Sequence, residues 1–531
     1  MDLQHFNSDA KKELVGRVSE HVFSDYLNFS ESRREQLLEE MIYWEKKRIE
    51  KIERSKKRIF FWDHFQQVYL KADLTEREAL LKKSIEIYTQ QVVGNFSPFF
   101  YTLATKAIPP FLSLLLNALS LKRLFSIKRS FVNENLLISG NLSLIRNLSE
   151  RGTLVFTPTH ASHLDSILLG CALHLSNLPP VMYGAGLNLF KNRLIGFFMN
   201  RLGAYKVDRL RIHQIYKDVL KEFATSSLEM GFHNLFFPGG TRSRSGAIEK
   251  RLKMGLLGTT LKAYIRNLKA KKPYPNIYIV PVNITSHLTL EAETLIEDFL
   301  AASGKSRFII EDDEFSRMNR IYQYIKNHMN LSSKTFIHFG NPLDPFGNTI
   351  NNQGGSVDHH DRPVDISRYV IKNGEIANDD ERDRNYTSEL ADALIDVFHR
   401  NNRVMSTHLV SFALYEMVAR THLDKNIYQL LRSHEYETPI ELVDLYKALD
   451  RIIPLLMQLS EQKRIVYGET LKTKDVQDIV NEALRIFSVY HTRKTIYREG
   501  DKIYIGDLLL LYYYHNRLIG YNLEDMVAKK V

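Results

Sequence analysis

The chain has 531 residues, too many for one ordinary domain of roughly 100–200 residues. Its composition, 44% hydrophobic and 25% charged, is typical of a folded protein and not of a disordered one. Basic residues outnumber acidic ones by 72 to 62, a formal charge of +10, which favours anionic partners such as phosphorylated substrates, acidic lipids or nucleic acid. A basic, solvated surface would give the same balance.

One cysteine and the N-terminal residues indicate a compartment. Cys171 is the only cysteine, so no intrachain disulfide can form, and its apolar surroundings predict a core position in a reducing environment. The first residues lack the basic start and apolar stretch of a signal peptide.

Residues 1–130 are predicted to form a helical N-terminal region. Between Ser30 and Arg58, apolar residues recur near helical spacing in a highly charged background. The stretch 99–121 is apolar, but Lys106 interrupts it, and its uncharged part of 15 residues is shorter than the roughly 18–20 needed to cross a bilayer. It is therefore expected either to lie on an anionic membrane surface or to be a buried core helix.

Residues 131–345 alternate short β-like runs with helical ones, which predicts an α/β domain with a central, mostly parallel sheet and flanking helices. The predicted strands are Thr153–Phe156, Val181–Gly184, Leu235–Phe237, Ile277–Ile284 and Thr335–Phe339. The predicted helices are Leu164–Leu175, Ile212–Thr225, Arg251–Asn267 and Glu314–Asn330.

Residues 346–385 are polar and rich in turn residues, so they are interpreted as an insertion or linker. The pair Asn373-Gly374 between short apolar runs predicts a hairpin. Residues 386–531 are predicted to form a mainly helical C-terminal region, with a second hairpin near Gly500.

A histidine and an aspartate lie at a predicted strand-to-helix turn within Phe156–Asp165. The strand ends before His160 and the helix begins near Ser162, so the histidine sits where α/β folds expose reactive groups. Asp165, in the first helical turn, can reach back to the imidazole, fix its tautomer and make it a general base. Alternatively, Ser162-x-x-Asp165 is a capping-box-like pattern, and the aspartate only caps the helix.

The same segment also approaches a metal-binding pattern. His160, His163 and Asp165 are close to a two-metal hydrolase signature, but the spacing differs by one residue. No second cluster follows at suitable spacing, because His359-His360-Asp361 lies in the polar insertion. No metal is therefore predicted.

Two later segments carry groups suited to phosphate. Leu202–Arg209 reads as a short strand with Lys206 and Asp208 on one face and Arg209 at its end, although an edge strand with solvated charges gives the same pattern. In Asn234–Gly246 an apolar strand leads into a loop whose glycines let the backbone approach an oxyanion and whose arginines can bind phosphate. A flexible basic loop would account for the charge but not for the strand.

In this order, His160-x4-Asp165, Gly203-x5-Arg209, the run from Phe237 to Arg244 and Val280-Pro281 resemble four sequence blocks of the glycerolipid acyltransferase superfamily. The long helical N-terminus and the Tyr/Arg-rich segment Leu510–Leu518 are most similar to the large bacterial glycerol-3-phosphate acyltransferases.

The resemblance implies an O-acyltransferase that esterifies glycerol 3-phosphate in phospholipid synthesis, with His160 as general base and Asp165 orienting it. The acceptor phosphate and the oxyanion are expected at Lys206, Arg209, Gly239, Gly240, Thr241, Arg242, Ser243, Arg244 and Lys253. Acyl-CoA or acyl-acyl carrier protein would be the co-substrate, without a metal or another cofactor. Partners would be the acceptor, the donor and an anionic membrane on its cytoplasmic face, bound peripherally or monotopically, and no nucleic acid.

The chain departs from the family pattern in two blocks. The third block usually carries a glutamate where Gly239, or Pro238 in another alignment, stands here. The second often has an aromatic or hydrophobic residue at Lys206 and a basic one at Asp208. The acceptor therefore stays open: lysophosphatidate or dihydroxyacetone phosphate are alternatives. A metal-dependent hydrolase or a non-catalytic membrane-binding protein is the alternative of another class.

Overall fold

The computed structural model describes residues 3–52, 56–106, 136–187, 190, 193–302, 334–422, 425–488 and 490–527. The predicted helix Glu314–Asn330 and residues 107–121 of the apolar stretch lie outside the described residues.

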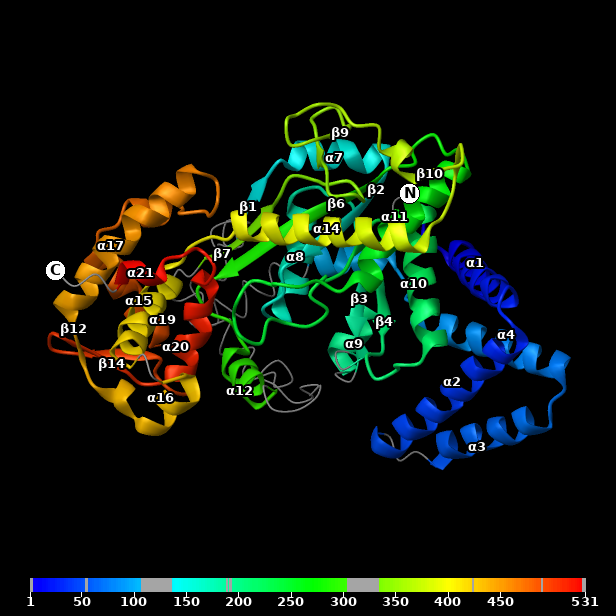
Figure 1. Cartoon of the computed structure of the whole chain (residues 1–531), viewed down its shortest axis with the longest axis horizontal. Coiled ribbons are helices and arrows are strands. Elements are labelled where there is room, and N and C mark those ends of the chain that lie inside the picture. Colours follow the sequence, from blue (N-terminus) through cyan, green and yellow to red (C-terminus); the bar gives the residue numbers. More distant parts are fainter. Residues whose placement is uncertain are drawn as a thin grey trace.

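A seven-stranded sheet in the order β1-β7-β6-β2-β5-β3-β4 forms the centre of the molecule (Figure 1). Its strands are β1 (Leu136–Gly140), β2 (Thr153–Pro158), β3 (Met182–Gly186), β4 (Ala204–Val207), β5 (Asn234–Leu235), β6 (Ile277–Ser286) and β7 (Thr335–Phe339). All neighbouring pairs are parallel except β6 and β7, which run antiparallel. The α/β prediction is confirmed, whereas β1 was not predicted from the sequence.

Helices cover both faces of the sheet, because alternate residues of each strand point to opposite sides. On β2, Leu154 and Phe156 pack against α7 (Leu142–Arg151) and α8 (Leu164–Leu175). Val155, between them, packs with α11 (Met254–Lys269) and α14 (Asp380–Arg400). The sheet is thus the middle of three layers, and every residue of β2 is buried.

The N-terminal region consists of η1 (Leu3–His5), α1 (Ser8–Leu27), α2 (Glu31–Ile52), α3 (Lys56–Lys71) and α4 (Leu74–Val92). An Asp73–Glu76 capping box starts α4, and the Asn7 side chain caps α1. The apolar faces of α1 and α4 pack on α10 (Gln214–Glu229), while α2 and α3 extend away from the sheet (Figure 1). Residues 98–106 then form a further helix.

Residues 346–385 fold onto the helix layer of α11 and α14. Phe346, Ile366 and Val370 are buried there, although the segment is polar overall. Its elements are β8 (Thr349–Ile350), β9 (Ser356–Val357), η5 (Ile366–Val370), β10 (Ile371–Lys372) and β11 (Glu375–Ile376). The hairpin predicted at Asn373-Gly374 is confirmed by the antiparallel β10–β11 pair.

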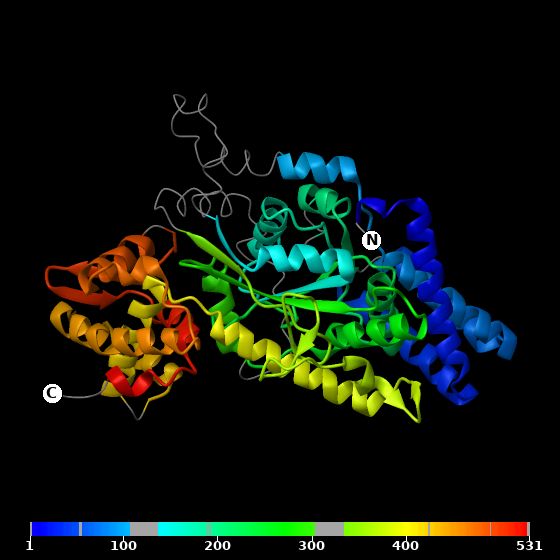
Figure 2. The same cartoon turned by 90° about the horizontal axis from the view of Figure 1, so that it is seen from above.

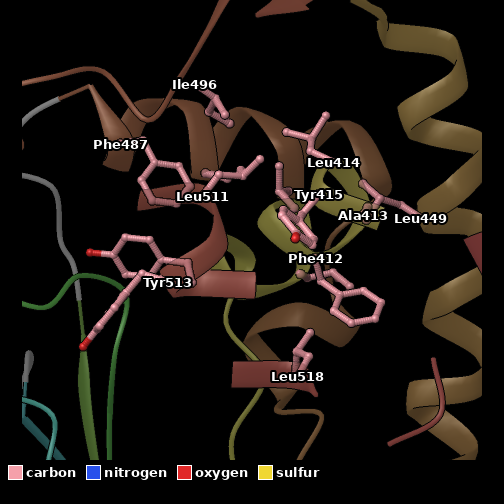
Figure 3. Packing of buried hydrophobic residues seen from close by; sticks show 14 of the residues in the cluster. Phe412, Ala413, Leu414, Tyr415, Leu449, Phe487, Ile496, Leu511, Tyr513 and Leu518 are labelled. Carbon is pink, nitrogen blue, oxygen red and sulfur yellow. The ribbon is translucent and has the colours of Figure 1, made fainter. Parts of the chain in front are cut away.

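The C-terminal region has its own hydrophobic core, built around the almost entirely buried α15 (Ser406–Thr421) (Figure 3). The other helices are α16 (Ile427–Ser433), η6 (Glu435–Glu437), α17 (Leu442–Glu461), α18 (Glu469–Lys472), α19 (Val476–Phe487), α20 (Leu508–His515), η7 (Asn516–Leu518) and α21 (Glu524–Val527). A small sheet joins β12 (Ile440–Glu441), β13 (Ile496–Glu499) and β14 (Lys502–Ile505), which confirms the hairpin predicted near Gly500.

The C-terminal core also includes residues 288–296, which come from the segment after β6 and the first turns of α12 (Ala292–Ala302). The N-terminal helices and the C-terminal region lie at opposite ends of the sheet domain (Figure 2). None of the described helices is both long enough and apolar enough to span a bilayer.

Candidate active site

The turn between β2 and α8 is organised by one carboxylate oxygen. Oδ2 of Asp165 accepts hydrogen bonds from the backbone N–H groups of Ala161 at 2.7 Å and Ser162 at 2.8 Å. The same oxygen lies 3.1 Å from Nδ1 of His160. Asp165 therefore makes one half of the capping-box contacts, with the Ser162 N–H, and orients the imidazole with the same oxygen, so the two interpretations are not exclusive.

The imidazole of His160 is buried and held on two sides. Its ring stacks on Phe237, with centroids 3.8 Å apart and planes 23° apart, while Asp165 engages Nδ1. Burial lowers the pKa of His160, and this outweighs the Asp165 carboxylate, which raises it. The ring is consequently neutral at pH 7, with Nε2 as the nitrogen that can accept a proton.

The loop after β5 holds the backbone of His160 from both sides of the residue. The His160 N–H donates to Oε1 of Glu249 at 3.0 Å, and its carbonyl oxygen accepts from the N–H of Ser243 at 2.7 Å. The Ser243 hydroxyl in turn donates to the carbonyl of Ala247 at 2.6 Å. The first and third sequence blocks thus form one unit, although about 80 residues separate them.

Three arginines from the second and third blocks gather beside this unit. The charges of Arg242 and Arg209 both lower the pKa of His160. The pKa of Arg209 is itself lowered by loss of hydration and by the charges of Arg242 and Arg244. Arg242 is buried and lies 3.3 Å from Glu291, and Arg244 lies 2.8 Å from Asp298. Arg209 remains accessible to solvent, although the surrounding chain removes part of its hydration. Three guanidinium groups therefore lie near the imidazole, and two of them face carboxylates.

Comparisons with known proteins point to the same segment. Residues 141–285 match the family model described as Acyltransferase. Proteins named glycerol-3-phosphate acyltransferase from Pseudomonas paraeruginosa and Ectopseudomonas mendocina are 28% identical over 204 residues, and one from Pseudomonas fluorescens is 27% identical. Residues 141–285 thus form a domain that is similar to the acyltransferases of glycerolipid synthesis. The matches cover 38% of the chain but only 22–23% of these relatives, so the chain aligns with less than a quarter of their length.

Other predicted site residues of the acyltransferase domain have different surroundings. Nζ of Lys206 lies 5.7 Å from the ring centre of Phe190. Burial, together with the positive charge of Lys206, lowers the pKa of Lys11. The N–H of Gly240 donates to the Phe237 carbonyl and is committed to the turn. Lys253 is exposed and packs across Gly240, whose φ of +76° suits glycine. Thr241 is exposed.

Two carboxylates of the site were missed from the sequence. Glu291 is fully buried, accepts the N–H of His163 at 3.0 Å and neighbours Arg242. Its position directly between the apolar residues Leu290 and Ala292 is a signal that could have found it, although Glu293 follows two residues later. Glu249 lies in a basic loop next to Lys250, and nothing in the sequence distinguishes it from a surface acid.

Neither a thiol nor a metal cluster marks this site. Burial raises the pKa of the Cys171 thiol to about 11, which keeps it protonated and unreactive at neutral pH. Within the described ranges, no three His, Cys, Asp or Glu side chains are grouped so that they could hold a metal ion. What the geometry of the acyltransferase domain offers is an oriented neutral imidazole beside positive charge, a combination suited to deprotonating a hydroxyl on a phosphorylated molecule.

Proposed function

We propose that this protein transfers an acyl chain from a thioester to a hydroxyl of glycerol 3-phosphate, giving lysophosphatidate. The observation that carries the proposal is the contact of His160 with Asp165 beside Arg209 and Arg242. The names of the matching relatives, glycerol-3-phosphate acyltransferase, support this choice of acceptor.

The reaction needs one proton to move twice. Nε2 of His160 takes the proton of the acceptor hydroxyl, and the oxygen attacks the thioester carbonyl. The tetrahedral intermediate collapses, the C–S bond breaks, and the leaving thiolate takes the proton back from the imidazolium. Asp165 keeps the ring in the tautomer with the proton on Nδ1 and stabilises the imidazolium between the two steps.

Arginine charge would hold the acceptor phosphate at a fixed distance from the imidazole. Arg209 is solvent-exposed and is the first candidate to contact an incoming phosphate, because Arg242 and Arg244 also face carboxylates. Glu291 lies 3.3 Å from Arg242 and accepts the N–H of His163, so it can hold this arginine beside the His160 turn. Lys253, exposed on the same loop as Gly240, is a second candidate.

The donor would be acyl-CoA or acyl-acyl carrier protein, met at the cytoplasmic face of a membrane. In the described part of the stretch 99–121, Phe99 is 71% and Leu103 is 42% exposed. Phe197, whose ring contacts that of Phe100, is 41% exposed. Apolar side chains grouped at the surface next to a further apolar segment suit peripheral binding to a bilayer. Co-sedimentation with anionic liposomes tests this part, and binding that is unchanged in F99D/L103D would contradict it.

An assay that crosses two acceptors with two donors tests the whole proposal. Glycerol 3-phosphate and lysophosphatidate are each offered with acyl-CoA and with acyl-acyl carrier protein. We expect labelled glycerol 3-phosphate to be acylated by the native protein, and H160A to lose activity by about 10²–10⁴-fold while remaining folded. H359A, at an exposed histidine of the insertion, is the control and should match the native rate.

Two variants separate acceptor binding from chemistry. R209A should raise the KM for glycerol 3-phosphate by about tenfold or more with a smaller change in kcat, because a charge-assisted contact to phosphate is lost. R146A, at an exposed arginine of α7, should leave the KM unchanged. Full activity of H160A, or preference for lysophosphatidate, would refute the reaction or the acceptor, respectively.

A further inference from the structure

The side chain of Glu249 fills the space beside Gly239. A Cβ at this position would lie 3.1 Å from Cγ and 3.4 Å from Oε1 of Glu249, which is tighter than ordinary packing. The backbone of Gly239 is not in the left-handed region, whereas that of Gly240 is, with φ of +76°. A side chain at 239 would therefore require Glu249 to shift, whereas the backbone conformation of Gly239 does not itself demand glycine.

The carboxylate in that space has a defined contact with the active site. Oε1 of Glu249 accepts the backbone N–H of His160 at 3.0 Å, and the side chain is partly buried. Together with the Ser243 N–H on the His160 carbonyl, it fixes both backbone polar groups of the proposed base. A rotation of this backbone would move the imidazole off Asp165 and off the Phe237 ring.

A glutamate side chain at position 239 would have the length to reach the place of the Glu249 carboxylate. The 3.4 Å from a Cβ added at 239 to Oε1 of Glu249 is within the span from Cβ to the carboxylate oxygens of a glutamate side chain. A glutamate at 239 could thus place an oxygen close to where Glu249 places it here. The two positions cannot both hold such a side chain in the present arrangement, so one of the two carboxylates would have to move.

We propose that Glu249 is the positioning residue of this active site, filling the space beside Gly239 with a carboxylate that holds the backbone of His160. Its role is to hold the His160 backbone so that the imidazole meets Asp165 and the acceptor hydroxyl in one geometry. This inference rests on the proposed acyl transfer for its activity readout, but its structural core, the shared space, can be tested without any substrate.

A double-mutant cycle in thermal unfolding tests the shared space. We expect G239E to lower Tm because its side chain meets Glu249, and E249A to lower it less. G239E/E249A should be more stable than G239E alone, since the second substitution removes the overlap. E150A, at an exposed acid of α7, is the control and should not relieve G239E. Equal Tm values for G239E and the double variant would overturn the proposal.

Rates of acyl transfer by the same variants test the positioning role of Glu249. We expect E249A to lower kcat by about tenfold or more, mainly without raising the acceptor KM, because the imidazole is displaced and not the phosphate. E249Q should restore most of the rate, since its amide oxygen can still accept the His160 N–H. G239E/E249A should be more active than either single variant.

The outcomes distinguish the two proposals. If the native protein acylates no acceptor, the proposed function fails, and the unfolding cycle alone decides on Glu249. If the native protein is active and the double variant is no better than E249A, the positioning role is refuted and the proposed function stands. A rate for E249Q as low as that of E249A would also refute it, because the hydrogen-bond acceptor would then be irrelevant.

Discussion

A single oxygen of Asp165 serves the backbone and the imidazole together. It accepts two N–H groups of the turn and contacts His160, so helix start and ring orientation depend on the same atom. Neighbouring Ser162 has only the first role, since its hydroxyl accepts the Leu164 N–H at 3.1 Å. The two residues therefore allow capping and ring orientation to be separated by substitution.

D165N should lower kcat for acyl transfer by about 10²–10⁴-fold, because an amide cannot stabilise an imidazolium and can favour the wrong tautomer. S162A should cost about 1 kcal/mol of stability through the lost cap while keeping kcat within about twofold. Both are measured by steady-state kinetics together with thermal unfolding. Equal losses of kcat in the two variants would mean that Asp165 acts only as a cap.

The pH dependence of the rate follows from the pKa of His160. Burial lowers that pKa below its ordinary value of 6.5, so the imidazole stays neutral and able to accept a proton to lower pH than a free histidine. We expect the midpoint of the acid-side fall in kcat/KM to lie below pH 6.5. Since Asp165 raises the pKa, residual activity of D165N should fall at still lower pH. A midpoint above pH 6.5 in the native protein would contradict this.

At the scale of elements, the sequence predicted those helices and strands whose bounds depend on residues close together in the chain. Helix Leu164–Leu175 was predicted with the bounds of α8, and β2 differs from its prediction by two residues, because unbroken apolar runs and a turn delimit both. β1 was missed, since it is a short edge strand that is stabilised by pairing with β7. The approach of Lys206 to the ring of Phe190 was not predicted from the sequence. Glu249 and Glu291 act through contacts with residues far away in the sequence, which periodicity does not encode.

The loop of the third block touches the C-terminal region at Gly246. This glycine has φ of +81°, and a Cβ there would overlap the carbonyl oxygen of Tyr513 on α20. Nearby, the Asn516 side chain donates to the Ser245 carbonyl at 2.9 Å. The turn that ends the third block is therefore built against α20 and η7.

G246A should destabilise the protein more than strain alone explains. Gly374, in the β10–β11 hairpin, is a matched control with φ of +84°, and a Cβ added there would meet no atom within 4 Å. G374A should cost only the left-handed backbone strain, about 1–2 kcal/mol. G246A should cost more and should also lower activity, because Tyr513 or the loop must move. Thermal unfolding and the acylation assay measure both, and equal costs would exclude a role for the contact.

On the scale of the molecule, the C-terminal region supports the proposed active site from one side. Arg517 is buried and donates to Asn402 at 3.0 Å and to the carbonyl of Ile284 at 3.3 Å. Burial raises the pKa of Glu249, and the positive charge of Arg517 partly offsets this rise. The hydroxyl of Tyr490 donates to the Leu290 carbonyl, next to Glu291. The segment that carries Glu291 is thus held by residues about 200 positions later in the chain.

The N-terminal helices support the site from the other side through a buried ion network. Glu45 on α2 lies 2.8 Å from Arg48 and 2.9 Å from Arg211, and both arginines also approach Asp208. Asp208 and Arg211 flank Arg209, so this network fixes the loop that carries the exposed arginine of the proposed acceptor site. Asp208 is therefore turned toward α2 and serves the structure of the loop.

Glu45 gives this network a pH dependence that can be measured. Burial alone would raise its pKa from the ordinary 4.5, but His213, Arg211 and Arg48 outweigh it and hold the pKa at about 2. A depressed carboxyl pKa contributes stability that is complete above pH 4.5 and is lost as the pH falls toward 2. The protonated glutamate then has nearly the shape and charge of glutamine.

E45Q should accordingly be less stable than the native protein by about 3–5 kcal/mol at pH 7, because the buried arginines lose their countercharge. The difference should narrow as the pH falls from 4.5 toward 2, where the native side chain is neutral as well. Urea unfolding followed by the fluorescence of Trp44 and Trp62, on α2 and α3, reports on this end of the molecule. E50Q, at an exposed acid of α2, should show no difference at any pH. A gap between E45Q and native protein that stays constant down to pH 3 would show that the charge of Glu45 does not hold the N-terminal helices in place.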